Sequence, residues 1–456
     1  MNGSPSSQRV SSAWSLANTV ATIAASFAGF VVVANLVGTD QLGLLALVGA
    51  ALFPLRFSEL GLAGAVTRYV GAYGGGNPHR YVWQVIALGW TISLAALAIL
   101  LGVCAVISPP LLRTTIGAGL HGQAWALVPL LAAQTALQLL VGPLTASLLG
   151  LHRFRLVYAC GVAVALGQLA AIVPLVSAFG IAGMVWSQIG AYTAFAVLFL
   201  PALLRLPAKV GGAEDAPLDR RAFLRFTFQF SLNSLLTTLL EPAAKLTLGA
   251  QASLAIMGVF EVMWRIFVQL RTLLVAPLNP LGIAMIGQWQ QGRAAVAGSY
   301  RIMATLALAG SAALIVAAPL AHWGFALVTP RAAAPELAVT ISVAAAIAIA
   351  FLTVPAHFLA LAANEVRPII AGTLTNLTLQ LGLGWPIGRL LGWQAVLGVF
   401  VGAYALSAAV QLTVSARLLR FRIVPPLADL RAGLGALLRH LGDLRQWIAG
   451  LAGARR

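Results

Sequence analysis

The chain has 456 residues, of which 60% are apolar and only 9% are charged, and its formal charge is +17 at pH 7. Soluble proteins carry roughly 25% charged residues, so this composition excludes a soluble globular domain, a disordered chain and a secreted disulfide scaffold. One membrane span needs about 20 apolar residues, so the length accommodates about 12 spans with short loops and one tail. We therefore predict an all-α polytopic membrane protein.

Twelve apolar stretches follow one another along the chain, and we predict a transmembrane helix in each. They cover residues 14–37, 43–71, 82–107, 124–150, 156–177, 181–204, 226–249, 254–286, 300–320, 336–362, 368–388 and 393–416. The second and eighth are longer than a bilayer requires, so we expect them to tilt or to extend into the cytoplasm. Prolines inside the stretches should break or kink the helices. These prolines are Pro54, Pro143, Pro174, Pro277, Pro280, Pro355 and Pro386, and the pair in the eighth stretch is a candidate hinge.

The basic residues indicate how the chain is oriented. If the N-terminus is cytoplasmic, the cytoplasmic segments hold 20 Lys and Arg residues, whereas the outer segments hold only Arg113, Arg331 and Arg389. Cytoplasmic loops of membrane proteins carry an excess of Lys and Arg, so we predict that both termini are cytoplasmic. The same rule explains the high net charge, and we therefore expect no nucleic-acid partner.

The two halves of the chain resemble each other. Residues 143–192 align with residues 355–404 without a gap, and the identical positions include prolines, an arginine, a glutamine and a Gly-Ala-Tyr triplet. We predict two parallel six-span repeats around a central cavity, as bundles at 1–204 and 226–416 joined by a cytoplasmic linker at 205–225. In transporters of this type the substrate site lies near the midplane between the repeats.

The last segment, residues 417–456, is a basic cytoplasmic tail. After Pro425 and Pro426 its leucines recur at 3- and 4-residue spacing, and arginines supply a basic side. This pattern is typical of an amphipathic helix that lies on anionic inner-leaflet lipids. The alternative is a helix that packs on the protein's own loops.

Charged residues inside the predicted spans are few, and each is a candidate functional residue because its insertion costs at least about 2.5 kcal/mol. They are the cations Arg56, Arg68, Lys245, Arg265 and Arg271 and the acids Glu59, Glu241 and Glu261. Helical spacing pairs Arg56 with Glu59, Glu241 with Lys245, and Glu261 with Arg265. Each pair is either a structural salt bridge or part of a site. For Arg68 and Arg271 the alternative is snorkelling to the cytoplasmic edge.

Charge and position suggest a role for each of these residues. A guanidinium matches the geometry of phosphate, so the candidate contacts for an anionic substrate are Arg56, Arg265, Arg271 and Lys245. Asn18 and Asn233, at equivalent places in the first and seventh stretches, are candidate polar residues of the cavity. Glu59, Glu241 and Glu261 are candidate ion-coupling groups, because a buried carboxyl can take up a proton near neutral pH. Cys104 and Cys160 lie in apolar stretches and read as buried apolar residues. We expect neither a metal site nor a cofactor.

One family resemblance is carried by residues 38–48 (GTDQLGLLALV), 58–62 (SELGL) and 65–70 (AVTRYV). They resemble the first-repeat pattern of Wzx-like bacterial polysaccharide flippases in the multidrug/oligosaccharidyl-lipid/polysaccharide exporter superfamily. The second half departs from the pattern, since the seventh and eighth stretches carry no such clear motif.

The resemblance implies two MATE-like bundles and a flippase of the bacterial inner membrane. Its substrate would be a polyprenyl-pyrophosphate-linked oligosaccharide, the repeat unit of a lipopolysaccharide or O-antigen, moved by alternating access. It also implies that Arg56 and Glu59 line the cavity, and that polysaccharide polymerase or assembly proteins are possible partners. The sequence has no P-loop pattern, so the energy would come from an ion gradient or from consumption of the product outside.

Two other functions remain open from the sequence. The first is a multidrug/cation antiporter of the same superfamily, which should favour acids in its cavity, whereas the cations outnumber the acids here by 5 to 3. The second is a membrane glycosyltransferase, polymerase or ligase. The outer loops are short and show no nucleophile–base set or carboxylate pair, so we expect no enzyme.

Overall fold

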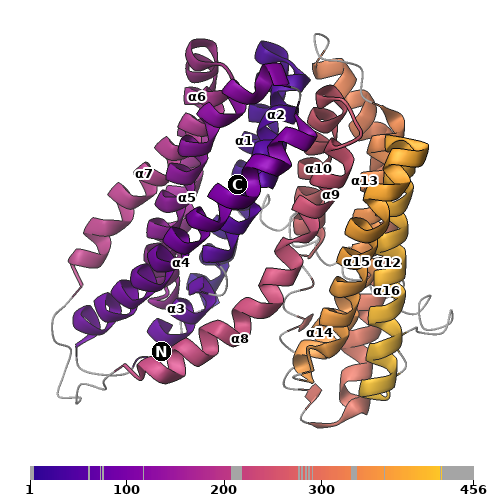
Figure 1. Cartoon of the computed structure of the whole chain (residues 1–456). Coiled ribbons are helices and arrows are strands. Elements are labelled where there is room, and N and C mark those ends of the chain that lie inside the picture. Colours follow the sequence, from indigo (N-terminus) through magenta and orange to yellow (C-terminus); the bar gives the residue numbers. More distant parts are fainter. Residues whose placement is uncertain are drawn as a thin grey trace, which may run out of the picture. The chain divides into compact units, whose positions relative to one another are not determined.

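The computed structural model describes residues 5–423 except for 60–61, 72, 74–76, 117, 207–217, 330–335, 364, 422 and parts of 276–290. The described residues form helices and turns with no strand (Figure 1). The chain divides into two compact units, Met1–Val262 with Phe325–Pro335, and Met263–Gly324 with Glu336–Arg456. Nearly all of the predicted basic tail lies outside the described residues.

The first unit contains ten α-helical segments within the described residues. They are α1 (Pro5–Val37), α2 (Thr39–Ala51), α3 (Leu62–Gly71), α4 (Pro78–Thr115), α5 (His121–Gly150), α6 (Phe154–Phe179), α7 (Ile181–Leu204), α8 (Arg220–Thr238), α9 (Leu240–Gly249) and the first part of α10 (Leu254–Val275), with 3-10 segments at Phe53–Glu59 and Ala118–Leu120. Helix α1 packs on α6, and α7 packs on both α5 and α6. An apolar core joins α3, α4, α5, α7 and α8 through side chains that include the fully buried Phe199 and Phe223.

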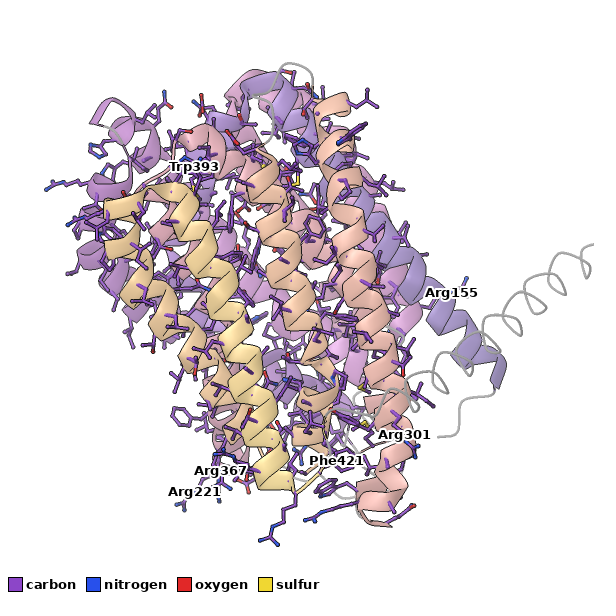
Figure 2. All side chains as sticks on the ribbon, turned by 90° about the vertical axis from the view of Figure 1, so that its right-hand side faces the viewer. Arg155, Arg221, Arg301, Arg367, Trp393 and Phe421 are labelled. Atoms are coloured by element: carbon purple, nitrogen blue, oxygen red, sulfur yellow. The ribbon has the colours of Figure 1, made fainter. Side chains whose placement is uncertain are left out.

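The second unit contains the rest of α10 together with α12 (Arg293–Val328), α13 (Leu337–Leu352), α14 (Val354–Ala362), α15 (Arg367–Leu391) and α16 (Trp393–Leu419). Helices α13 and α15 both pack on α16. Figure 2 shows Trp393 at one end of α16 and Phe421 just beyond its other end, near Arg367 at the start of α15. There the hydroxyl of Tyr300 on α12 donates to the carbonyl oxygen of Ile423 at 2.8 Å, which fixes the chain after α16 against α12.

Within the described residues, three of the predicted spans are interrupted, and each interruption lies just before a proline. Helix α2 ends at Ala51 ahead of Pro54, α8 ends at Thr238 ahead of Pro242, and α13 ends at Leu352 ahead of Pro355. A proline ring clashes with the carbonyl group four residues earlier and lacks an amide hydrogen. The breaks at Pro54 and Pro355 were predicted, and that at Pro242 was not. Helices α5, α6 and α15 run on through Pro143, Pro174 and Pro386. The predicted hinge prolines Pro277 and Pro280 lie outside the described residues.

The helices account for the twelve predicted stretches. Within the described residues, eight helices are long and apolar enough to cross a membrane. The second stretch is α2 with α3, the seventh α8 with α9, and the tenth α13 with α14. The eighth begins with α10 and continues past Val275 into a part of the chain that the structure describes only in places, while the others each correspond to one helix. The prediction of an all-α polytopic membrane protein with about 12 spans is confirmed. The domain boundaries at 204, 225 and 416 stay predictions.

The internal repeat is also visible in the backbone. Gly180, between α6 and α7, has a φ of 60°, and Gly392, between α15 and α16, has a φ of 84°. The alignment of the two halves pairs these glycines. Both adopt a conformation that side-chain-bearing residues rarely take, so the same turn joins the last two helices of each half.

Candidate functional site

The first charged cluster consists of Glu241, Lys245 and Glu261. The side chain of Lys245 is buried, with the residue only 3% exposed. Its Nζ lies 2.5 Å from Oε1 of Glu241 and also forms an ion pair with the carboxylate of Glu261. One ammonium between two carboxylates leaves the cluster with a formal charge of −1. Because a buried ion is costly unless it is paired, the three side chains depend on one another.

The local sequence explains half of this cluster. Glu241 and Lys245 are four residues apart on α9, so they share a face of the helix. Glu261 comes from the following helix, α10, and spacing along the chain had paired it with Arg265 instead. The contact between Glu261 and Lys245 depends on how α9 and α10 pack, which no periodicity in the sequence indicates.

The second charged group surrounds Arg271, near the end of α10. The Nε atom of Arg271 is buried and has no hydrogen-bond partner among the described residues. No carboxylate in that part of the chain forms an ion pair with it. Its electrostatic neighbours are Tyr404 and His357. Arg271 thus differs from Lys245, whose charge two carboxylates compensate.

The acids of the second unit cannot compensate Arg271. Within the described residues of that unit they are Glu336 and Glu365. Glu336 is exposed at the start of α13, and Glu365 precedes α15. Glu365 is bound by Arg367, whose guanidinium hydrogen bonds at 2.7 and 2.5 Å hold the pKa of Glu365 at about 2. The described spans of this unit therefore contain cations and no acid.

Tyr404 on α16, an electrostatic neighbour of Arg271, belongs to a row of aromatic contacts that joins α10 to α16. The rings of Trp264 and Phe400 are 6.1 Å apart between centroids, and those of Phe400 and Tyr404 are 5.2 Å apart. Tyr404 belongs to the repeated Gly-Ala-Tyr triplet, and its counterpart Tyr192 donates a hydrogen bond of 2.8 Å to Gln138. We had not singled out Tyr404 or His357 as neighbours of an arginine. The repeated triplet was the one signal that could have drawn attention to Tyr404.

For some of the other predicted site residues, the structure describes the backbone but not the side chain. The backbones of Arg56 and Glu59 belong to the 3-10 segment after α2, and that of Asn233 to α8, but their side chains lie outside the described residues. Asn18 on α1 packs against Gly161 of α6, where a Cβ on the glycine would overlap its Oδ1. Arg265 is half-buried on α10. The roles predicted for all these residues stay predictions.

Comparisons with known proteins identify the fold. No model of a known protein family and no curated protein sequence matches the chain. Among solved structures, the lipid II flippase MurJ in an inward closed conformation matches with a TM-score of 0.68 and 12% identity, over 93% of this chain and 90% of that one. The chain therefore shares its fold with this flippase structure.

Two further solved structures have a similar fold. An inward-facing multidrug resistance MATE family transporter of the MOP superfamily has a TM-score of 0.58 and 15% identity, and covers 88% of this chain and 94% of its own. A Vibrio cholerae MATE transporter matches with a TM-score of 0.62 and 13% identity, and the match covers 91% of this chain and 97% of that transporter. At these identities the likeness concerns the fold and not the substrate. It accords with the predicted MATE-like bundles.

Proposed function

We propose that the protein is a flippase that moves a polyprenyl-pyrophosphate-linked oligosaccharide across the bacterial inner membrane by alternating access. The observation that carries this proposal is Arg271, a half-buried cation whose Nε atom is buried and which has no carboxylate partner among the described residues. A buried charge is stable only when something compensates it. A pyrophosphate would supply that compensation, and a guanidinium binds phosphate oxygens with paired hydrogen bonds.

The proposed site extends from Arg271 to the other cations. Arg56 and Arg265 are the further proposed contacts to the pyrophosphate, and Asn18 and Asn233 are proposed polar residues of the cavity. Lys245, predicted from the sequence as a substrate contact, is held by Glu241 and Glu261. We therefore assign Lys245 to ion coupling together with these two acids, with Glu59 as a further candidate. Two kinds of partner remain proposed. Anionic lipids would bind the basic tail, and polysaccharide polymerase or assembly proteins would act together with the flippase.

Deletion in the native host tests the substrate. The expected result is loss of one surface glycan and accumulation of its lipid-linked repeat unit on the inner face of the membrane. Unchanged surface glycans would refute the proposal.

Substitution of Arg271 tests the residue that carries the proposal. Arg271→Ala should reduce export of the repeat unit at least tenfold, about 1.4 kcal/mol in substrate interaction. Arg271→Lys, which keeps the charge and loses the planar fork, should retain part of the activity. The unfolding midpoint of the purified Arg271→Ala protein should stay unchanged or rise, because a half-buried cation without a carboxylate partner among the described residues is removed.

A matched control is Arg417→Ala, which removes an exposed arginine from α16 of the same unit. This control should export normally. A lower unfolding midpoint for Arg271→Ala together with normal export would show a structural role and remove Arg271 from the site.

A cation antiporter is the second candidate function, and the Glu241–Lys245–Glu261 cluster favours it. Its formal charge of −1 and its burial suit a coupling proton or a cationic drug. Expression in a strain that lacks its efflux pumps separates the candidates. Tolerance to many cationic drugs, with no change in any glycan, would favour the antiporter.

A further inference from the structure

The turn between α5 and α6 has the same backbone conformation as the turn between α14 and α15, its counterpart in the alignment of the two halves. Leu151, the first residue after α5, has φ and ψ angles of −78° and 8°. Ala363, the first residue after α14, has angles of −79° and −3°. In both turns the amide of this residue donates to the carbonyl oxygen four residues earlier, that of Ser147 or of Leu359. We call them the first turn and the second turn.

A second hydrogen bond also recurs, two residues further along each turn. The amide of Arg153 donates to the carbonyl oxygen of Leu148 at 2.9 Å, and the amide of Glu365 donates to that of Ala360 at 2.8 Å. Bonds of this length along the chain close the C-terminus of a helix. Arg153 and Glu365 are therefore held in equivalent places, each relative to the helix that precedes it.

The side chains on the two turns differ in charge. In the second turn the carboxylate of Glu365 accepts hydrogen bonds of 2.7 and 2.5 Å from the guanidinium of Arg367, and the two formal charges cancel. The first turn carries arginines at both corresponding positions, Arg153 and Arg155, with a formal charge of +2. Both are exposed, and neither forms an ion pair with a described residue.

The ion pair of the second turn shows what side chains at these two positions can reach. Both carboxylate oxygens of Glu365 contact the guanidinium of Arg367. Two arginines on the same backbone can therefore approach one shared ligand from both sides. That ligand must be an anion, because two guanidinium groups otherwise repel each other. Their planar forks match the oxygen atoms of a phosphate group.

The position of the first turn indicates where the phosphate would come from. The turn joins α5 and α6, which are both long and apolar enough to cross a membrane. Phe154, between the two arginines, stacks on Tyr158 with ring centroids 6.4 Å apart and an angle of 14° between the rings. Tyrosines are enriched at the level of the lipid headgroups. This arrangement favours a lipid phosphate, and the predicted orientation puts the turn at the inner leaflet, where anionic lipids are abundant.

We propose that Arg153 and Arg155 bind the phosphate group of an anionic phospholipid at the cytoplasmic surface of the membrane. The second turn has no such site, because Glu365 already binds the arginine there. The hydrogen bonds that fix the backbone of the first turn reduce the ordering cost of binding. The proposal depends neither on the transported substrate nor on the basic tail.

Exchanging the charges of the two turns tests the proposal. Arg153→Glu gives the first turn the Glu and Arg of the second, so that its remaining arginine is paired within the chain. Glu365→Arg gives the second turn the two arginines of the first. Phosphatidylglycerol is titrated into the purified protein in a neutral detergent, and the bound lipids are counted by native mass spectrometry. Arg153→Glu should weaken binding of one lipid about tenfold or more, and Glu365→Arg should add one bound lipid.

Arg80→Glu is the matched control, because it makes the same change of charge at an exposed arginine near the start of α4. It should leave the number of bound lipids and their affinity unchanged. All variants are compared as folded protein from size-exclusion chromatography. If Arg153→Glu does not fold, Glu365→Arg decides alone.

Two competitors identify the source of the phosphate. Inorganic phosphate at the same concentration as phosphatidylglycerol should not displace the lipid, and farnesyl pyrophosphate should compete no better than the lipid itself. Displacement by inorganic phosphate, or tighter binding of farnesyl pyrophosphate, would overturn the assignment to a phospholipid. An unchanged lipid count and affinity in either exchange variant, or an equal loss in Arg80→Glu, would show that these arginines form no specific site.

Discussion

Two cations on neighbouring helices, Lys245 and Arg271, differ in their surroundings although the sequence placed them in one group. Lys245 lies between two carboxylates, whereas Arg271 has none as an ion-pair partner in the described part of the chain. The difference arises because Glu261 reaches back from α10 to α9. A cation that is already paired contributes to the structure first, and a cation without a partner is the better candidate for an anionic ligand.

This difference can be measured as stability. Lys245→Ala leaves the buried carboxylate of Glu261 and the half-buried carboxylate of Glu241 without a cation, which should destabilise the protein by about 3–5 kcal/mol. The unfolding midpoint in detergent should fall clearly. Adding Glu241→Gln and Glu261→Gln removes both stranded charges and should restore most of the loss.

The control for this series is the double variant Glu241→Gln/Glu261→Gln alone, which leaves Lys245 buried without a carboxylate and should be as unstable as Lys245→Ala. If Lys245→Ala unfolds at the wild-type midpoint, the three side chains do not form a buried ionic cluster.

At the scale of single elements, the turns between paired helices depend on glycine. Gly392 has a φ of 84° and a Cβ there meets no atom within 4 Å, so only the backbone conformation resists substitution. With a ψ of 178° as well, Gly392 lies in a region open essentially to glycine alone, so Gly392→Ala should destabilise the protein by about 1–3 kcal/mol. Thermal unfolding in detergent measures the effect, and Gly180→Ala should behave in the same way.

Gly398→Ala is the control in this case. Gly398 lies within α16, and a Cβ there also meets no atom within 4 Å. Alanine favours a helix by up to about 1 kcal/mol over glycine, so this variant should be as stable as the wild type or more so. A loss of stability from Gly398→Ala equal to that from Gly392→Ala would contradict the argument from backbone conformation.

At the scale of the whole molecule, hydropathy and prolines predicted where the helices lie and where they break. They did not predict the contacts between helices. The twelve stretches became helices because twenty or so apolar residues in a bilayer have hardly any alternative. The breaks before Pro54 and Pro355 were predicted because proline acts locally. The pairing of Lys245 with Glu261 was not predicted, since it joins separate helices and leaves no periodic signal in either. The match of Gly180 with Gly392 was visible in the alignment, but the positive φ was not.

The orientation of the whole chain is the last prediction, and exposed acidic residues outside the helix interiors allow a direct test. Single cysteines replace Asp40 at the start of α2, Glu336 at the start of α13, and Asp219 before α8, all of which are exposed. The excess of basic residues in the predicted cytoplasmic segments implies that Asp40→Cys and Glu336→Cys react with an impermeant maleimide in intact cells. Asp219→Cys should react only after permeabilisation. The reverse pattern would place both termini outside.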